Sequence, residues 1–337
     1  MRARQRHDRR GPAVRSLTAV TTALAVAAVL AGCGSNGSSG SSGSTAGSSS
    51  ASASSPATAS FPVTVAAANG QVTVKTEPKR IVSLSPTATE DLYAVGAGKQ
   101  VVAVDSSSNY PSGVPVTSLS GLTPNLEAII KYSPDLVVAS ADSGGLVAGL
   151  TKVGVPVLIE PAAAQLNDAY QQIEQLGTAT GHSSQAQSTV ATMKSEIAAD
   201  VKLAGTGHKG LSYFWEVSAN PYYSATSTTF IGQVVSLFGL KNIADAADKA
   251  SDGGYPELSQ EYIVTAKPQL LLLADNSAAD GGQSPSVVAA RPGWSGIPAV
   301  KTGQIVGLND DIASRWGPRL PQLVAQIAQA LQKAPTS

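Results

Sequence analysis

The chain has 337 residues, of which 42% are hydrophobic, 14% charged and 5% aromatic, a composition that permits globular cores and a length that favours two domains. Its formal net charge is zero, but six of its arginines lie within residues 1–15. Beyond residue 15 there are 17 basic and 22 acidic residues, which argues against a nucleic-acid-binding protein, because such proteins need clustered positive charge.

The N-terminus has the pattern of an export signal. A basic region precedes the apolar run 17–30, which is too short for a confident membrane span. The run ends in the letters LAGC at 30–33, which look like a bacterial lipobox, and Cys33 is the only cysteine. We predict a lipoprotein signal peptide over residues 1–32 and lipidation of Cys33, which leaves no disulfide; the alternative is a chance cysteine after an ordinary signal. Arg9 and Arg10 leave Sec and twin-arginine export both open.

Residues 33–60 are almost entirely Ser, Gly, Ala and Thr after the cysteine. Such a segment cannot bury enough apolar surface to order itself, so we predict a disordered tether. A lipid, a tether and a globular body together predict a protein anchored at the extracytoplasmic face of the cell membrane.

Residues 61–162 alternate short strands with helices, which predicts an N-terminal α/β lobe with a mostly parallel sheet. Thr87 and Glu90 have capping-box spacing, so we expect a helix to begin there. A second helix has a plausible cap at Asn125 and ends before Pro134. The predicted strands are the runs 80–84, 101–104, 136–139 and 157–159.

Residues 163–208 have no strand pattern and form a predicted helical connection. The stretch 183–204 lacks Pro and has no Gly, so it predicts one helix about 30 Å long, enough to bridge two lobes. A second α/β lobe is predicted over 209–337, with strands at 211–217 and 305–308 and a helix at 229–238. An amphipathic last helix is predicted from Leu320, Leu323, Val324, Ile327, Ala328 and Leu331.

One local unit occurs twice, as NLEAIIKYSPDLVVAS at 125–140 and SQEYIVTAKPQLLLLA at 259–274. Both copies predict a helix, a break at proline and a buried strand, so the two lobes share a design. Glu127 and Glu261 occupy the same position in the first helical turn, where a carboxylate favours the helix dipole by about 0.3–1 kcal/mol. A structural role for both acids is therefore an open alternative to a functional one.

A series of short motifs runs along residues 79–333. They are RIVSLSP at 80–86 with Thr89-Glu90, PNLEAI at 124–129, PDLV at 134–137, NPYY at 220–223, Asn242-Ile243, Tyr255-Pro256, SQE at 259–261 and Pro318-Arg319. Each motif is short, but their order and spacing together are specific, and they resemble the solute-binding proteins of ABC importers for cobalamin and ferric siderophores. The resemblance implies two Rossmann-like lobes joined by one long rigid helix, with ligand held in the cleft between them.

The resemblance also implies roles for particular residues. Glu127 and Glu261 match the exposed glutamates, one per lobe, that pair with arginines of the importer's membrane subunits. Glu90 is instead expected to be the acid of a capping box. The expected ligand contacts are Tyr222, Tyr223, Tyr255, Asp311, Arg315 and Tyr110. Alternatively, the tyrosines are half-buried anchors of their loops, and Arg315 forms an ion pair with Asp310 or Asp311.

The first lobe departs from the cobalamin pattern, because serines at 106–108 replace an expected aromatic and another is missing near 119–122. The ligand is therefore expected to be a cobalamin-like corrinoid or a ferric siderophore, and the protein a monomer that delivers it to a permease with ATPase subunits. No cofactor is expected. A ligand-sensing lipoprotein that signals to a membrane receptor is an alternative with the same fold.

Two other classes receive little support from the sequence. His182 and His208 flank the bridging helix and are expected to be exposed, which argues against a direct metal site. Without a histidine base near a serine, the remaining enzyme alternative is a carboxylate-based hydrolase that uses Glu216 and Asp310 or Asp311.

Overall fold

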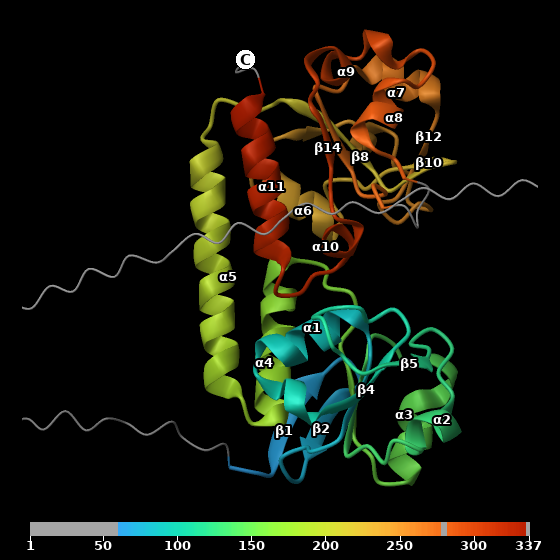
Figure 1. The fold of residues 1–337 in the computed structure, drawn as a ribbon, viewed down its shortest axis with the longest axis vertical. Coiled ribbons are helices and arrows are strands. Elements are labelled where there is room, and N and C mark those ends of the chain that lie inside the picture. Colours follow the sequence, from blue (N-terminus) through green and yellow to red (C-terminus); the bar gives the residue numbers. More distant parts are fainter. Residues whose placement is uncertain (1–59, 278–281, 335–337) are drawn as a thin grey trace, which may run out of the picture. The chain divides into compact units, whose positions relative to one another are not determined.

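The computed structural model describes residues 60–277 and 282–334, so the predicted signal peptide, the tether and Cys33 lie outside it. The described chain forms two α/β lobes beside one long helix, α5 (Figure 1). The predicted fold class is therefore confirmed.

The N-terminal lobe is a five-stranded parallel sheet in the order β5-β4-β3-β6-β7. Strands β6 and β7 are apolar throughout and buried, because helices cover both faces of this part of the sheet. Leu136 and Val138 pack in the cluster that contains α1 and α4, whereas Val137 packs with α2 and α3. The elements are an antiparallel hairpin of β1 (Val63–Ala67) and β2 (Gly70–Val74), then β3 (Ile81–Leu84), α1 (Pro86–Ala94), β4 (Val101–Asp105), β5 (Val116–Leu119), α2 (Leu126–Ile130), β6 (Leu136–Ala139), α3 (Leu146–Lys152) and β7 (Val157–Ile159).

The C-terminal lobe has a four-stranded parallel sheet in the order β11-β8-β13-β14 and a small antiparallel sheet in the order β12-β10-β9. Its elements are β8 (Ser212–Glu216), β9 (Ser218–Ala219), β10 (Tyr222–Tyr223), α6 (Phe230–Ser236), β11 (Lys241–Asn242), β12 (Glu257–Leu258), α7 (Gln260–Ala266), β13 (Leu270–Leu273), α8 (Pro285–Ala289), α9 (Pro298–Thr302), β14 (Ile305–Gly307) and α10 (Asp310–Ser314). Short 3-10 turns lie at Ala97–Gln100, Ser143–Gly145, Ala244–Ala246 and Trp294–Gly296.

Two helices, α4 (Leu166–Thr180) and α5 (Ser183–Ala204), connect the lobes, and the C-terminal α11 (Leu320–Lys333) packs against α5. The 22 residues of α5 span about 33 Å. Its buried stripe of Ala186, Val190, Met193, Ile197 and Ala204 recurs at intervals of three, four or seven residues.

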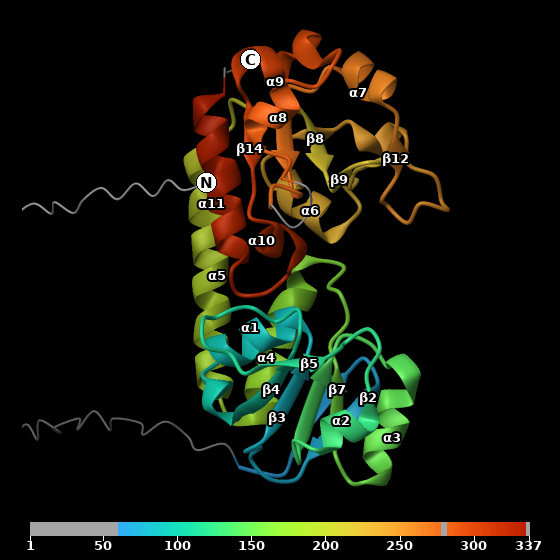
Figure 2. The same cartoon turned by 45° about the vertical axis from the view of Figure 1, so that its right-hand side comes forward.

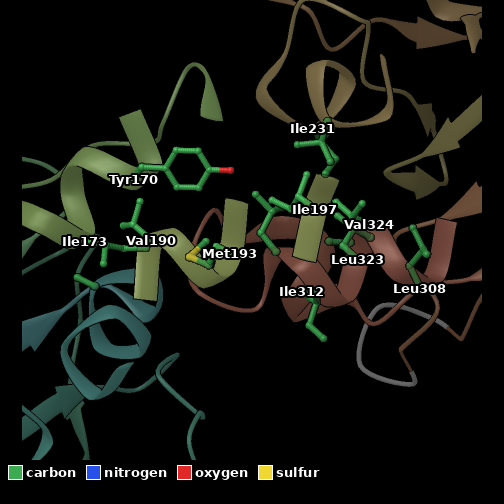
Figure 3. Packing of buried hydrophobic residues seen from close by; sticks show 14 of the residues in the cluster. Tyr170, Ile173, Val190, Met193, Ile197, Ile231, Leu308, Ile312, Leu323 and Val324 are labelled. Atoms are coloured by element: carbon green, nitrogen blue, oxygen red, sulfur yellow. The ribbon is translucent and has the colours of Figure 1, made fainter. Parts of the chain in front are cut away.

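One hydrophobic cluster follows α5 from lobe to lobe. Figure 3 shows Tyr170 and Ile173 of α4 near Val190, and Leu323 and Val324 of α11 near Ile197. The predicted apolar stripe of α11 is buried in this cluster as expected. Because interiors pack at near-crystalline density, we infer that a core shared by both lobes resists large changes in their separation.

The repeated unit adopts the same structure in both copies. Asn125 caps α2 as predicted, and Ser259 caps α7 in the same way. In each copy the residue before the proline has a positive φ, 48° at Ser133 and 51° at Lys267. Lys267 is the residue that caps the end of α7, whereas Ser133 lies three residues beyond the end of α2. The strands that follow, β6 and β13, are completely buried.

Two local expectations were wrong. Ser85, not Thr87, caps α1, with its hydroxyl accepting from the Ala88 amide, so Glu90 is not the acid of a capping box. His208 is buried rather than exposed, with a relative accessibility of 6%. Residues Asp310–Ser314 form the short helix α10, which Asn309 caps.

Candidate functional site

A cavity of about 560 Å³ lies where the strands of the C-terminal sheet end, beside the junction with the first lobe. Ligands of open α/β sheets bind outside the carboxyl ends of the strands, so this is the expected position for a site. The volume is within the range of about 300–1,000 Å³ typical of small-molecule pockets. Its walls include Ala162, Ala163, Trp215, Val217, Ser218, Phe230, Ile231, Tyr255, Ala274, Asp275, Asp310, Arg315 and Trp316.

Arg315 extends from this cavity to the first lobe and takes part in a buried ionic network. Its guanidinium lies 2.7 Å from Glu90 and 2.5 Å from Asp311. It also donates to the Asn109 side chain and to the Ser107 carbonyl, at 2.9 and 3.3 Å. The structural alternative, an ion pair with Asp311, is present, but Glu90 is a partner that the sequence did not indicate.

Arg319 completes the network. Its Nε and Nη2 atoms donate to both carboxylate oxygens of Glu90, at 2.7 and 2.5 Å. Its guanidinium also lies 4.2 Å from the centre of the Tyr110 ring, a distance suited to a cation–π contact. We call Glu90, Asn109, Asp311, Arg315 and Arg319 the inter-lobe ion-pair cluster.

The cluster holds the lobes together at the cleft. Glu90 belongs to α1 of the first lobe, whereas both arginines lie between α10 and α11 of the second. Figure 2 shows α10 next to α1 where the two lobes meet. The side chains of Glu90, Arg315 and Arg319 are 1%, 10% and 11% exposed, so water screens these charges weakly. Asn109 adds a further inter-lobe bond by donating to Asp311 at 2.8 Å.

A second buried ionic group lies behind the cavity, at the ends of β8 and β13. Arg291 donates to both oxygens of Glu216 at 2.6 and 2.7 Å, and to the Gln283 side chain. The Glu216 carboxylate is therefore already paired with Arg291, which argues against the alternative that it serves as a hydrolase carboxylate. Burial and the neighbouring Glu216 charge raise the pKa of Asp275 to about 7.

Two more buried acids lie in the first lobe, near Glu90. Burial raises the pKa of Glu160 to about 8. The pKa of Asp91 is raised well above its ordinary value, first by burial and then by the negative charges of Glu90 and Glu160. Glu160 is therefore mostly neutral near pH 7, and the same burial favours the neutral form of Asp91.

The predicted ligand tyrosines separate into two groups. Tyr255 lines the cavity and is 47% exposed. Tyr222 lies against Trp294, with ring centres 5.7 Å apart, and beneath Arg291. Tyr222, Tyr223 and Tyr110 are not among the residues that line the cavity.

The predicted docking glutamates have matching surroundings. Glu127 and Glu261 are both exposed, and each lies in the first turn of its helix. Within residues 60–277 and 282–334, neither forms an ion pair. Their carboxylates are accessible to a partner.

The described residues contain no group of three or more His, Cys, Asp or Glu side chains arranged to hold a metal ion. No helix among them combines the length and apolar character needed to cross a bilayer.

Two parallel-sheet lobes, a bridging helix and a cleft cavity define a two-lobed solute-binding protein. A family model described as periplasmic binding protein matches residues 81–312, and the chain belongs to that family.

Three similar proteins illustrate this family. An uncharacterized ABC transporter substrate-binding lipoprotein of Bacillus subtilis, YvrC, is 34% identical over 79% of this chain and 83% of its own. A vitamin B12-binding protein of Pectobacterium atrosepticum is 30% identical over 77% and 92%. A crystal structure of a possible iron-binding periplasmic protein from Staphylococcus epidermidis is 27% identical, with a TM-score of 0.65 over 76% of this chain and 99% of that one.

Proposed function

We propose that the protein is the extracytoplasmic solute-binding component of an ABC importer, anchored by a lipid at Cys33, and that its ligand is a cobalamin-like corrinoid. The observation that carries this is the cavity at the carboxyl ends of β8 and β13, beside an arginine that contacts both lobes. The vitamin B12-binding relative supports the choice of ligand. The protein would bind without catalysis, since Glu216 is already held by Arg291.

A corrinoid is larger than the drug-sized molecules that fill a cavity of this volume, so binding requires more space than the cleft now offers. The core along α5 resists wide separation of the lobes. The inter-lobe ion-pair cluster, in contrast, can exchange its hydrogen bonds for bonds to a polar ligand. Ligand therefore enters by displacing side chains at the cleft, with small movement of the lobes.

Delivery would use the two exposed glutamates. An importer with two-fold symmetry offers equivalent basic sites, and Glu127 and Glu261 supply one acid from each lobe. Exposed charges of this kind direct orientation and encounter rate more than affinity. The permease would then accept the ligand while its ATPase subunits hydrolyse ATP.

A ferric siderophore is the second candidate ligand. The residues at 106–108 are all serine, where an aromatic would suit a flat corrin ring, and Arg315 already contacts the Ser107 carbonyl there. The possible iron-binding neighbour is consistent with this reading. A receptor-linked sensor remains the alternative to an importer component.

Ligand retention tests the proposal. The full chain is incubated separately with cyanocobalamin and with ferrichrome, and each mixture is passed through a desalting column. Coloured cyanocobalamin that elutes with protein supports the corrinoid carrier, and retained ferrichrome alone assigns an iron carrier. Retention of neither refutes both ligands.

A further inference from the structure

Asp275 is a buried acid that the proposed function has not yet used. It lies two residues after β13, which is in the interior of the C-terminal sheet, and it lines the cleft cavity. The residue is 3% exposed. Neither carboxyl oxygen accepts a hydrogen bond from a donor in the part of the chain that the structure describes.

The neighbouring arginine does not account for this acid. Both terminal nitrogens of Arg291 donate to Glu216, and Nη2 also donates to Gln283. That ion pair is complete without Asp275. Buried polar groups are hydrogen-bonded in the great majority of cases, because an unpaired one costs free energy. Protonated Asp275 can donate to Glu216, but its anion has no side-chain donor among the described residues. We therefore look to a ligand for a donor to this carboxylate at the cavity wall.

The other walls of the cavity indicate what such a ligand carries. Arg315 supplies hydrogen-bond donors, whereas Trp215, Phe230 and Ile231 supply apolar surface. A primary carboxamide on an apolar framework satisfies both, because its oxygen accepts from a guanidinium and its N–H donates to a carboxylate. A ligand carboxylate would instead be repelled by the negative charges of Asp275 and Asp310, which both line the cavity.

We propose that Asp275 accepts a hydrogen bond from a carboxamide N–H of the ligand, and that it selects corrinoids with amide side chains over those with carboxylates. This inference rests on the proposed corrinoid function and adds a specificity residue to it. Amide side chains surround the corrin ring of cobalamin, whereas their hydrolysed forms carry carboxylates in the same places.

The titration of Asp275 provides an independent readout. The charged or titratable groups around it are Glu216, Arg291, Arg315, Asp310 and Tyr255. Burial, then the charge of Glu216 and a hydrogen bond to it, favour the protonated acid, whereas the backbone amide of Asp275 and the charge of Arg291 favour the anion. An N–H donor binds the anion more strongly. Affinity should therefore rise several-fold from pH 6 to pH 8 in the wild type.

The test measures dissociation constants of the full chain for cyanocobalamin and for its monocarboxylate derivatives, made by hydrolysis of one side-chain amide. Loss of a hydrogen bond to a charged group predicts about tenfold to hundredfold weaker binding by Asp275→Ala. Asp275→Asn should weaken binding less and abolish the rise with pH. Asp200→Asn, on α5, removes the same charge away from the cavity, and it should change neither the affinity nor its pH dependence. At least one monocarboxylate should bind about tenfold more weakly than cyanocobalamin.

The possible failures are distinguishable. If the wild type does not bind cyanocobalamin, the corrinoid function fails and this inference fails with it. If the wild type binds cyanocobalamin but the Asp275 variants bind equally well with the same pH profile, the function stands and the inference is overturned. Equal affinity for cyanocobalamin and every monocarboxylate also overturns it. These last measurements use wild-type protein, so they do not depend on the folding of a variant.

Discussion

Glu90→Gln tests whether the inter-lobe ion-pair cluster stabilises the fold. The substitution keeps the size of the side chain but removes the only carboxylate that contacts both Arg315 and Arg319 in the described residues. Removal of one partner from a buried ion pair costs about 3–5 kcal/mol, because it leaves an uncompensated charge. Arg315 retains Asp311, and Arg319 retains the Tyr110 ring, so we expect the lower end, about 3 kcal/mol.

Urea denaturation of the full chain, followed by tryptophan fluorescence, measures this change. The midpoint should fall without a change in slope, and the melting temperature should fall by about 6 °C or more. Glu77→Gln is the control, because Glu77 forms an exposed pair with Lys79 and its loss should have no measurable effect. If Glu90→Gln unfolds at the wild-type midpoint, the reasoning that Glu90 neutralises two buried arginines is refuted.

Three further predictions concern other parts of the molecule. Glu127→Lys with Glu261→Lys should abolish uptake into cells while ligand affinity in solution is unchanged; lost affinity would contradict a docking role. Burial raises the pKa of Glu160 to about 8 in the folded state. The contribution of this group to the free energy of unfolding is therefore complete below its unfolded pKa near 4.5 and is lost as pH rises to about 8. Urea denaturation at pH 5 and pH 8 gives the free energy of unfolding at each pH. The difference between the two values should be a few kcal/mol smaller in Glu160→Gln than in the wild type. Gly121→Ala should destabilise by about 1–3 kcal/mol in the same assay, because its Cβ would meet the Leu84 carbonyl at 2.2 Å.

The fold was predictable from the sequence because its signals are local. Strand β6 coincides with the predicted 136–139 run, since four apolar residues after a proline fit a strand buried on both faces. Helix α5 begins at 183 and ends at 204 as predicted, because Gly181 and Gly205 flank a segment without a helix breaker.

The site was less predictable because its contacts join distant residues. Glu90 and Arg315 are 225 positions apart, and no local spacing indicates that they meet. Glu90 also coincides with capping-box spacing, which led to the wrong role. Asp275 follows the apolar run 270–273, and the rule for strand ends in parallel sheets would have identified it as a candidate.

The two ways in which the lobes are joined have different consequences for ligand binding. Apolar contacts along α5 gain nothing from a polar ligand, so that part of the junction stays unchanged. Arg315 already has four partners, and a ligand that contacts it must replace bonds of similar strength. Its net contribution to affinity is therefore small, although it still rejects ligands that cannot accept a hydrogen bond. The Asp275 carboxylate gives up no side-chain donor of the described residues when a ligand donor arrives, so affinity should depend more on this acid than on the arginine opposite.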